Sequence, residues 1–176
     1  MELSAHITGS IGSILDRELA ALSREVDAFP DESQLWRTAP GVTNTAGNLV
    51  LHLAGNLQHF FGAVLAGTGY IRDRPAEFSR RAVPRTELLR EIDAARQAVR
   101  IGVSRLSAAQ LTAEYPEAIA GNRVLTGEYL VHLVAHAAYH LGQVDYLRRL
   151  LTGSEQTVGA VRPADLSSAR PAQVGA

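Results

Sequence analysis

Residues 126–152 read TGEYLVHLVAHAAYHLGQVDYLRRLLT, and this stretch does most to decide the fold. Histidines recur within it at steps of four, at His132, His136 and His140, and side chains at that spacing lie near one another on an α-helix. From Gly153 onward the chain is small, polar and proline-bearing. We therefore expect a helix from near Thr126 to about Thr152.

Three other segments have apolar residues spaced by three and four, which is the pattern of a helix with one buried face. They run from about Ala5 to Ala28, from about Asn44 to Ala66 and from near Pro84 to about Leu106. Asn44 is a plausible N-cap, and Pro84 suits the first turn of a helix. The stretch Tyr70–Phe78 between the second and third segments is expected to be a long loop.

Four amphipathic helices of about 20–27 residues favour a four-helix bundle. No convincing set of alternating strands is found, so the expected class is all-α. The long connections leave room for a crossover instead of a simple up-and-down order. We expect one bundle domain over residues 1–152 and a disordered tail over residues 153–176.

Composition narrows the possible functions. The 176 residues carry 17 basic and 18 acidic side chains, a balance that gives no reason to expect nucleic acid or an anionic membrane as partner. Cysteine is absent, which excludes disulfides and thiolate metal sites. Neither a signal peptide nor an apolar run of about 18 residues is found, and the expected location is the cytoplasm.

The histidines predict a metal site with two open choices. His132 and His140 are about 12 Å apart along a helix, so only one of them can share an ion with His136. A third ligand would come from the second helix, where His52 and His59 are about 10 Å apart and only one can take part. The alternative is that these are surface or hydrogen-bonded core histidines. The glutamate of an H-E-x-x-H motif is missing, so metalloprotease chemistry is not indicated.

Three stretches resemble the DinB-like (damage-inducible) superfamily, and the second and third resemble an uncharacterised branch of it. The first is HAAYHLGQ, residues 136–143, preceded by His132. The others are NTAGNLVLHLAGN, residues 44–56, and YIRDRPAEF, residues 70–78. The resemblance spans about residues 5–152. It implies a four-helix bundle with a metal held by His52, His136 and His140, although Tyr139-His140-Leu141 stands where many relatives carry a double histidine and arginine.

Relatives in that superfamily include enzymes that use low-molecular-weight thiols, such as mycothiol-dependent isomerases and bacillithiol transferases. The resemblance therefore favours a metal-dependent transferase or hydrolase acting on a small molecule, with such a thiol as a candidate substrate. The alternatives are a non-catalytic bundle that a metal staples together, acting as a binding or dimerisation module, and a bundle without metal.

Imidazole ligands suit zinc and nickel, which are the first choices, as well as iron and copper. A homodimer through helix faces is a further expectation. Seven residues are candidates for lining the site or supporting its ligands: Asn56, His59, His132, Tyr139, Arg72, Arg74 and Glu77.

Overall fold

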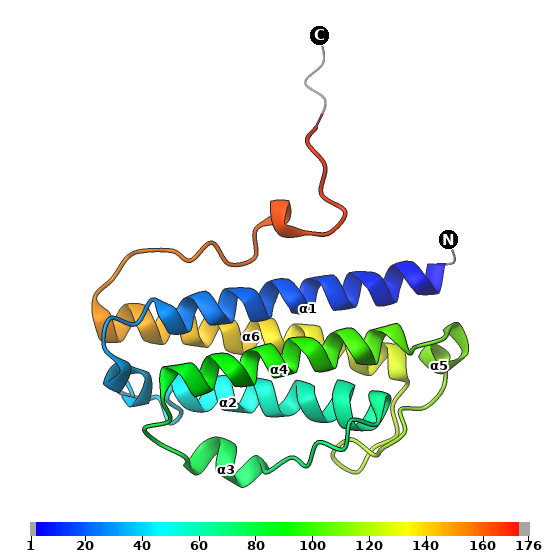
Figure 1. The fold of residues 1–176 in the computed structure, drawn as a ribbon, viewed down its shortest axis with the longest axis horizontal. Coiled ribbons are helices and arrows are strands. Elements are labelled where there is room, and N and C mark those ends of the chain that lie inside the picture. The colour runs from blue at the N-terminus through cyan, green and yellow to red at the C-terminus, as the bar shows by residue number, and fades with distance from the viewer. Residues whose placement is uncertain (1–2, 173–176) are drawn as a thin grey trace.

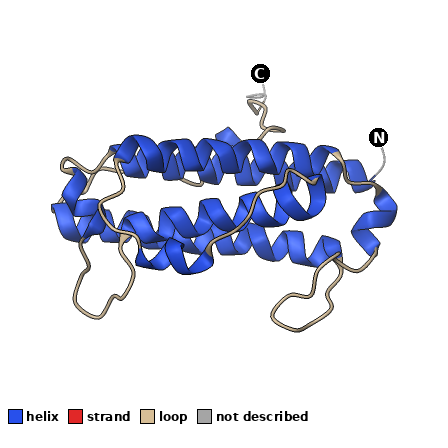
Figure 2. Ribbon diagram, turned by 60° about the horizontal axis from the view of Figure 1, so that its bottom comes forward, coloured by secondary structure: helices blue, strands red, loops and turns tan. Residues whose placement is uncertain are grey.

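The computed structural model describes residues 3–172, and within this range every regular element is a helix (Figures 1 and 2). The elements in chain order are α1 (Leu3–Asp27), the short η1 (Glu32–Trp36), α2 (Ala46–Leu57), the π-helical η2 (Gln58–Leu65), α3 (Arg74–Ser79), α4 (Arg85–Ser104), α5 (Ala108–Thr112), α6 (Thr126–Thr152) and the short η3 (Pro163–Asp165). The expected all-α class is confirmed.

The four long elements α1, α2 with η2, α4 and α6 form the bundle (Figure 1). Helices α2 and α4 run in the same direction, and the segment that contains α3 crosses back along the bundle to join them. Helix α6 runs opposite to α2 and packs against both α2 and α1. The crossover connection is therefore confirmed, and it lays α3 over α2.

The core lies where the apolar faces of the four helices meet. Its most deeply buried side chains include Leu15, Leu19, Leu22, Leu53, Leu57, Leu88, Ile92, Leu133 and Val144. Most of these residues belong to the apolar positions spaced by three and four in the sequence. Burying a leucine or isoleucine side chain contributes about 1.5–3 kcal/mol, so this shared core is what holds the four helices together.

Two local predictions need correction. The N-cap of α2 is Thr45, not Asn44, because the Thr45 side chain accepts a hydrogen bond from the Asn48 backbone N–H. The expected loop over residues 70–78 contains most of α3. Asp73 caps this helix by accepting from the Ala76 N–H, and Pro75 lies in its first turn, where a missing N–H costs nothing.

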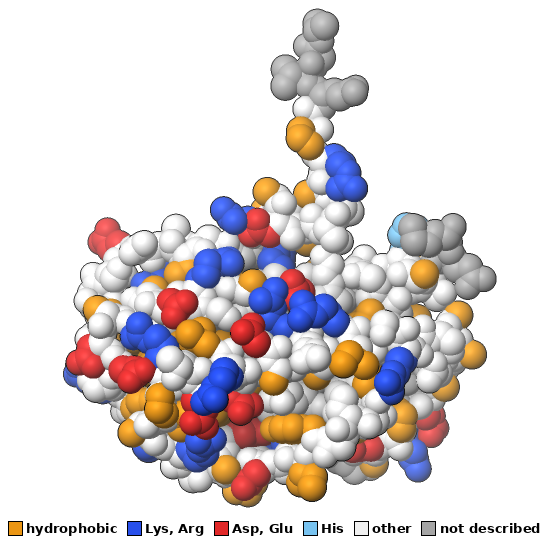
Figure 3. Space-filling model, in the orientation of Figure 1, with side chains coloured by type: hydrophobic (Ala, Val, Ile, Leu, Met, Phe, Trp, Pro, Cys, Tyr) orange, Lys and Arg blue, Asp and Glu red, His pale blue; other side chains and the backbone are white. Residues whose placement is uncertain are grey.

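Helix α6 ends at Thr152, and Gly153 follows with a left-handed φ of 69°. Beyond it the chain runs back over α1, where Arg24 donates to the Val158 carbonyl at 2.9 Å. The domain division at residue 152 and the disorder of the tail stay predictions, and residues 173–176 lie outside the described range. On the face drawn in Figure 3, basic and acidic side chains are intermingled. None of the helices in the described range is long and apolar enough to cross a membrane.

Candidate metal centre

Three histidines from two antiparallel helices meet in the bundle: His52 of α2, and His136 and His140 of α6. One ligand nitrogen from each lies within 4.8 Å of the others. The Nε2 atoms of His52 and His136 are 3.2 Å apart, and the ring centroids of the three are separated by 4.6 to 5.1 Å. Within residues 3–172, this is the one group of three or more histidine, aspartate or glutamate side chains that could hold an ion.

The His52 ring is oriented by a buried ion pair. Its Nδ1 lies 2.9 Å from Glu77 Oε2, and Arg72 donates to both oxygens of the same carboxylate at 2.7 and 2.9 Å. Burial alone would raise the pKa of Glu77, but the hydrogen bonds from His52 and Arg72 outweigh it and hold this pKa below its usual value. An ionised carboxylate only accepts, so Nδ1 of His52 carries the proton and its Nε2 presents a lone pair to the cluster.

The two histidines of α6 differ in their support. His140 Nδ1 donates to Gln143 Oε1 at 2.6 Å, which likewise turns its Nε2 away from that partner. His136 Nδ1 is buried and makes no hydrogen bond with the described residues. His136 is thus held mainly by packing and by the contact of its Nε2 with His52 Nε2.

The cluster favours neutral imidazoles. Burial, followed by the nearby His140 and His52 rings, lowers the pKa of His136 to about 3. Burial also lowers the pKa of His140, although the Gln143 hydrogen bond opposes it. A neutral imidazole keeps the lone pair that a metal ion needs, so both side chains are ready to act as ligands at neutral pH.

A polar side chain of α2 holds the C-terminal end of α3 against this helix. The side chain of Asn48, in the first turn of α2, donates to the Glu77 carbonyl at 2.8 Å and to the Arg80 carbonyl at 3.1 Å. Gly55 permits the close approach, because a Cβ at this position would overlap Glu77 Oε1. These contacts place the Glu77 carboxylate beside His52, although the two residues are 25 positions apart in the sequence.

Arg74, His132 and Tyr139 lie at the edge of the site. The guanidinium of Arg74 sits over the Phe78 ring, which in turn lies 4.9 Å from the His52 ring. His132 is exposed, with its ring 6.2 Å from that of His136, and Tyr139 is 65% exposed. None of the three provides an atom to the cluster.

Asn56 and His59 lie beyond His52 on the same chain segment. Asn56 is buried, and its Oδ1 has no partner among the described residues. His59 Nε2 pairs with Glu117 at 3.0 Å instead of joining the cluster. Of the seven supporting candidates, Arg72 and Glu77 are therefore the two that hold a cluster histidine in place.

Residues missed at the sequence level include Gln143, Phe78 and Gly55. Gln143 had a readable signal, because a side chain three residues after a helical histidine lies beside it. Phe78 and Gly55 had none, since their roles depend on where the crossover segment lies.

Glu77→Gln should weaken zinc binding by about 10- to 100-fold, because the lost charge no longer fixes the Nδ1 proton of His52 and its ring orientation. The measurement is a zinc titration of tag-free protein against a competing chelator, with circular dichroism to confirm retained helix. Glu117→Gln is the matched control, since Glu117 faces His59. Equal affinity in Glu77→Gln and native protein would contradict this role.

Metal-free protein should lose stability as the pH falls from about 6.5 toward 3. Unfolded His136 takes up a proton near 6.5, whereas the folded side chain stays neutral down to about 3. Between these values the unfolded state binds more protons, so acid favours unfolding. Urea midpoints measured from about pH 7 to pH 4 should fall more steeply in the native chain than in His136→Gln. Parallel pH profiles would show that His136 contributes nothing to the loss.

The fold and the site together define an all-α bundle that gathers three imidazoles from two antiparallel helices. A family model described as mycothiol-S-transferase matches residues 10–153, and the chain belongs to this family. The family is part of the DinB-like superfamily, so the wider resemblance is confirmed, whereas the assignment to an uncharacterised branch is not. A search of curated proteins gave no match.

Proposed function

We propose that the protein is a divalent-metal-dependent S-transferase that joins a low-molecular-weight thiol, mycothiol or a chemical relative, to an electrophilic small molecule. His52, His136 and His140 are the proposed metal ligands. The observation that carries the proposal is the convergence of these three nitrogens within 4.8 Å in a chain of the mycothiol-S-transferase family.

The donor set fits a divalent transition metal. Two imidazole nitrogens on a tetrahedral zinc ion lie about 3.3 Å apart, given zinc–nitrogen bonds of about 2.0–2.1 Å. The His52 and His136 Nε2 atoms are 3.2 Å apart, and hydrogen bonds to Glu77 and Gln143 leave the Nε2 atoms of His52 and His140 unprotonated. Zinc and nickel are the proposed metals, with iron and copper as alternatives that the same ligands accept.

Three neutral ligands leave a divalent ion with an open position, as in catalytic sites. When bound, such an ion lowers the pKa of a thiol and so raises the thiolate fraction at neutral pH. Burial lowers the pKa of His136 and His140 and so keeps these two imidazoles neutral, and Glu77 with Arg72 fixes the orientation of the His52 ring. In the transfer, the thiol sulfur forms a bond to the electrophilic carbon, the leaving group departs with its bonding electrons, and the thiol proton passes to solvent.

A cytoplasmic location suits an enzyme of low-molecular-weight thiols, which are kept reduced there. The homodimer stays a prediction.

The test uses tag-free protein loaded with zinc or nickel, mycothiol as thiol and monobromobimane as electrophile. We expect conjugate formation well above the uncatalysed rate, loss of the excess rate with a chelator, and its return when metal is restored. His140→Ala should abolish the excess rate, whereas Tyr139→Phe, one residue away on the exposed side, should retain it. Turnover that survives in His140→Ala would rule out the proposed metal role. Tight metal binding without turnover across mycothiol, bacillithiol and glutathione would favour the non-catalytic metal-stapled bundle.

A further inference from the structure

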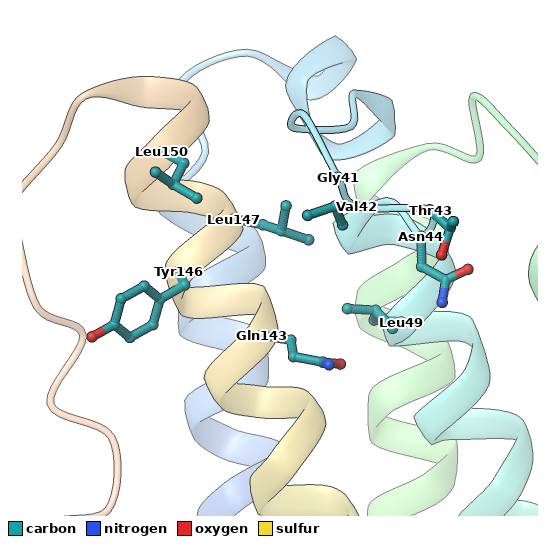
Figure 4. Close-up of a pocket in the computed structure, with 9 residues that line it drawn as sticks. All are labelled: Gly41, Val42, Thr43, Asn44, Leu49, Gln143, Tyr146, Leu147 and Leu150. Atoms are coloured by element: carbon teal, nitrogen blue, oxygen red, sulfur yellow. The ribbon is translucent and has the colours of Figure 1, made fainter.

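A cavity of about 320 Å³ lies between the start of α2 and the second half of α6 (Figure 4). It is lined by Gly41, Val42, Thr43, Asn44, Leu49, Gln143, Tyr146, Leu147 and Leu150. Val42, Leu49, Gln143 and Leu147 point into the space between the two helices, whereas the Tyr146 ring turns away from it. Its size is that of a site for a small molecule.

The cavity adjoins the histidine cluster on both helices. Leu49 precedes His52 by three residues, and Gln143 follows His140 by three, which places each about 4.5 Å along its helix from a cluster histidine. Because α2 and α6 run in opposite directions, these two offsets point to the same side of the cluster. Gln143 joins the two sites directly, since its Oε1 accepts from His140 Nδ1.

The two sides of the cluster differ in chemistry. The cavity side has four leucine and valine side chains, at Val42, Leu49, Leu147 and Leu150, beside the polar Thr43, Asn44 and Gln143. On the opposite side lie His132, whose ring stacks near that of His136, and His59 paired with Glu117. A thiol that carries polar groups finds hydrogen-bonding partners on the second side, whereas an apolar group finds contacts on the first.

We propose that the cavity between Leu49 and Leu147 binds the apolar part of the electrophilic substrate, with its reactive carbon directed toward the cluster at Gln143. This inference rests on the proposed S-transferase function and deepens it. The electrophile is then a small apolar molecule with a carbon that the thiol sulfur attacks as a leaving group departs, and the thiol approaches from the side of His59 and His132.

Binding of a neutral apolar probe tests the cavity without any reaction. N-phenyl-1-naphthylamine should bind native protein, and Val42→Asp should weaken its binding by about 10-fold or more, because the apolar probe would have to displace water from a charged side chain on its contact surface. Val131→Asp is the matched control: it makes the same change at an exposed valine of α6 that lines a separate apolar groove with Ile7 and Ile14, so it also shows whether the probe binds there instead. Leu150→Asp, at the cavity rim, gives an independent second variant if Val42→Asp does not fold by circular dichroism.

Kinetics extend the test to turnover. With mycothiol fixed, Val42→Asp should raise KM for monobromobimane about 10-fold. With monobromobimane fixed, KM for mycothiol should stay unchanged. Bromide and a proton are released with each conjugate. For iodoacetamide, a small polar electrophile, KM should differ little between native protein and Val42→Asp.

The outcomes separate this inference from the function on which it rests. Equal probe affinity in the Val42→Asp, Leu150→Asp and Val131→Asp variants, or a raised KM for mycothiol instead of monobromobimane, would overturn the cavity assignment while metal-dependent turnover stands. His136→Ala should lose the metal but keep native probe affinity. Probe affinity that falls with His136→Ala as much as with Val42→Asp would also overturn it, since the probe would then occupy the cluster itself.

Discussion

His136→Ala should lower affinity for zinc by about 100-fold or more, and for nickel by a similar factor. His136 lies close to both other histidines of the cluster, with its Nε2 3.2 Å from that of His52 and its ring centroid 4.6 Å from that of His140. Its removal leaves two imidazoles on opposite helices, and two neutral ligands hold a divalent ion far more weakly than three. Elemental analysis of tag-free protein after dialysis measures the metal content and so tests this loss directly.

His132→Ala is the matched control for this loss. It removes an imidazole one turn earlier on α6, at an exposed position, and should leave metal content unchanged. A native metal content in His136→Ala would show that the ligand set is wrong. Loss of metal in both variants, with native circular dichroism, would instead draw His132 into the site.

Arg148→Ala should destabilise the bundle by about 3–5 kcal/mol, without any change in metal content. Arg148 is 1% exposed at its side chain and pairs with the fully buried Glu25 of α1. It also donates to Asp145 and to the Gln156 carbonyl. Burial raises the pKa of Glu25 against the opposing effect of Arg148, so removing the guanidinium leaves a buried carboxyl without its cation.

Thermal unfolding measures this loss, which for a chain of this size corresponds to a fall in Tm of roughly 10 °C. Arg96→Ala is the control: Arg96 joins Asp16 across α1 and α4, but both side chains are partly exposed, and the cost should stay below about 1 kcal/mol. The double variant Glu25→Leu with Arg148→Met should recover much of the stability, because it removes both buried charges. Equal Tm values for Arg148→Ala and Arg96→Ala would show that the buried pair contributes no more than a surface one.

The long helices were predictable because local sequence determines them. The predicted and observed bounds of α6 agree at Thr126 and Thr152, where Gly153 supplies the left-handed residue that ends the helix. Helix α3 was missed because six residues are too few for periodicity, although Asp73 followed by Pro75 carries an N-terminal signal. The π-helical turn of η2 is likewise invisible to a pattern built on 3.6 residues per turn.

The candidate site was less readable than the helices. From helical spacing, either His132 or His140 could share a metal ion with His136, and either His52 or His59 could supply the third ligand. The family resemblance implied His140 and His52. The structure brings His52, His136 and His140 together and sends His59 to Glu117. The contact of Glu77 with His52 depends on the crossover path between α2 and α4, which no local pattern encodes.

A crystal structure of the zinc-loaded protein, with anomalous diffraction recorded at the zinc edge, tests the central claim most directly. We expect one strong anomalous peak within about 2.0–2.1 Å of the Nε2 atoms of His52, His136 and His140. A peak bound by other side chains, or fully loaded protein with none at this cluster, would contradict it.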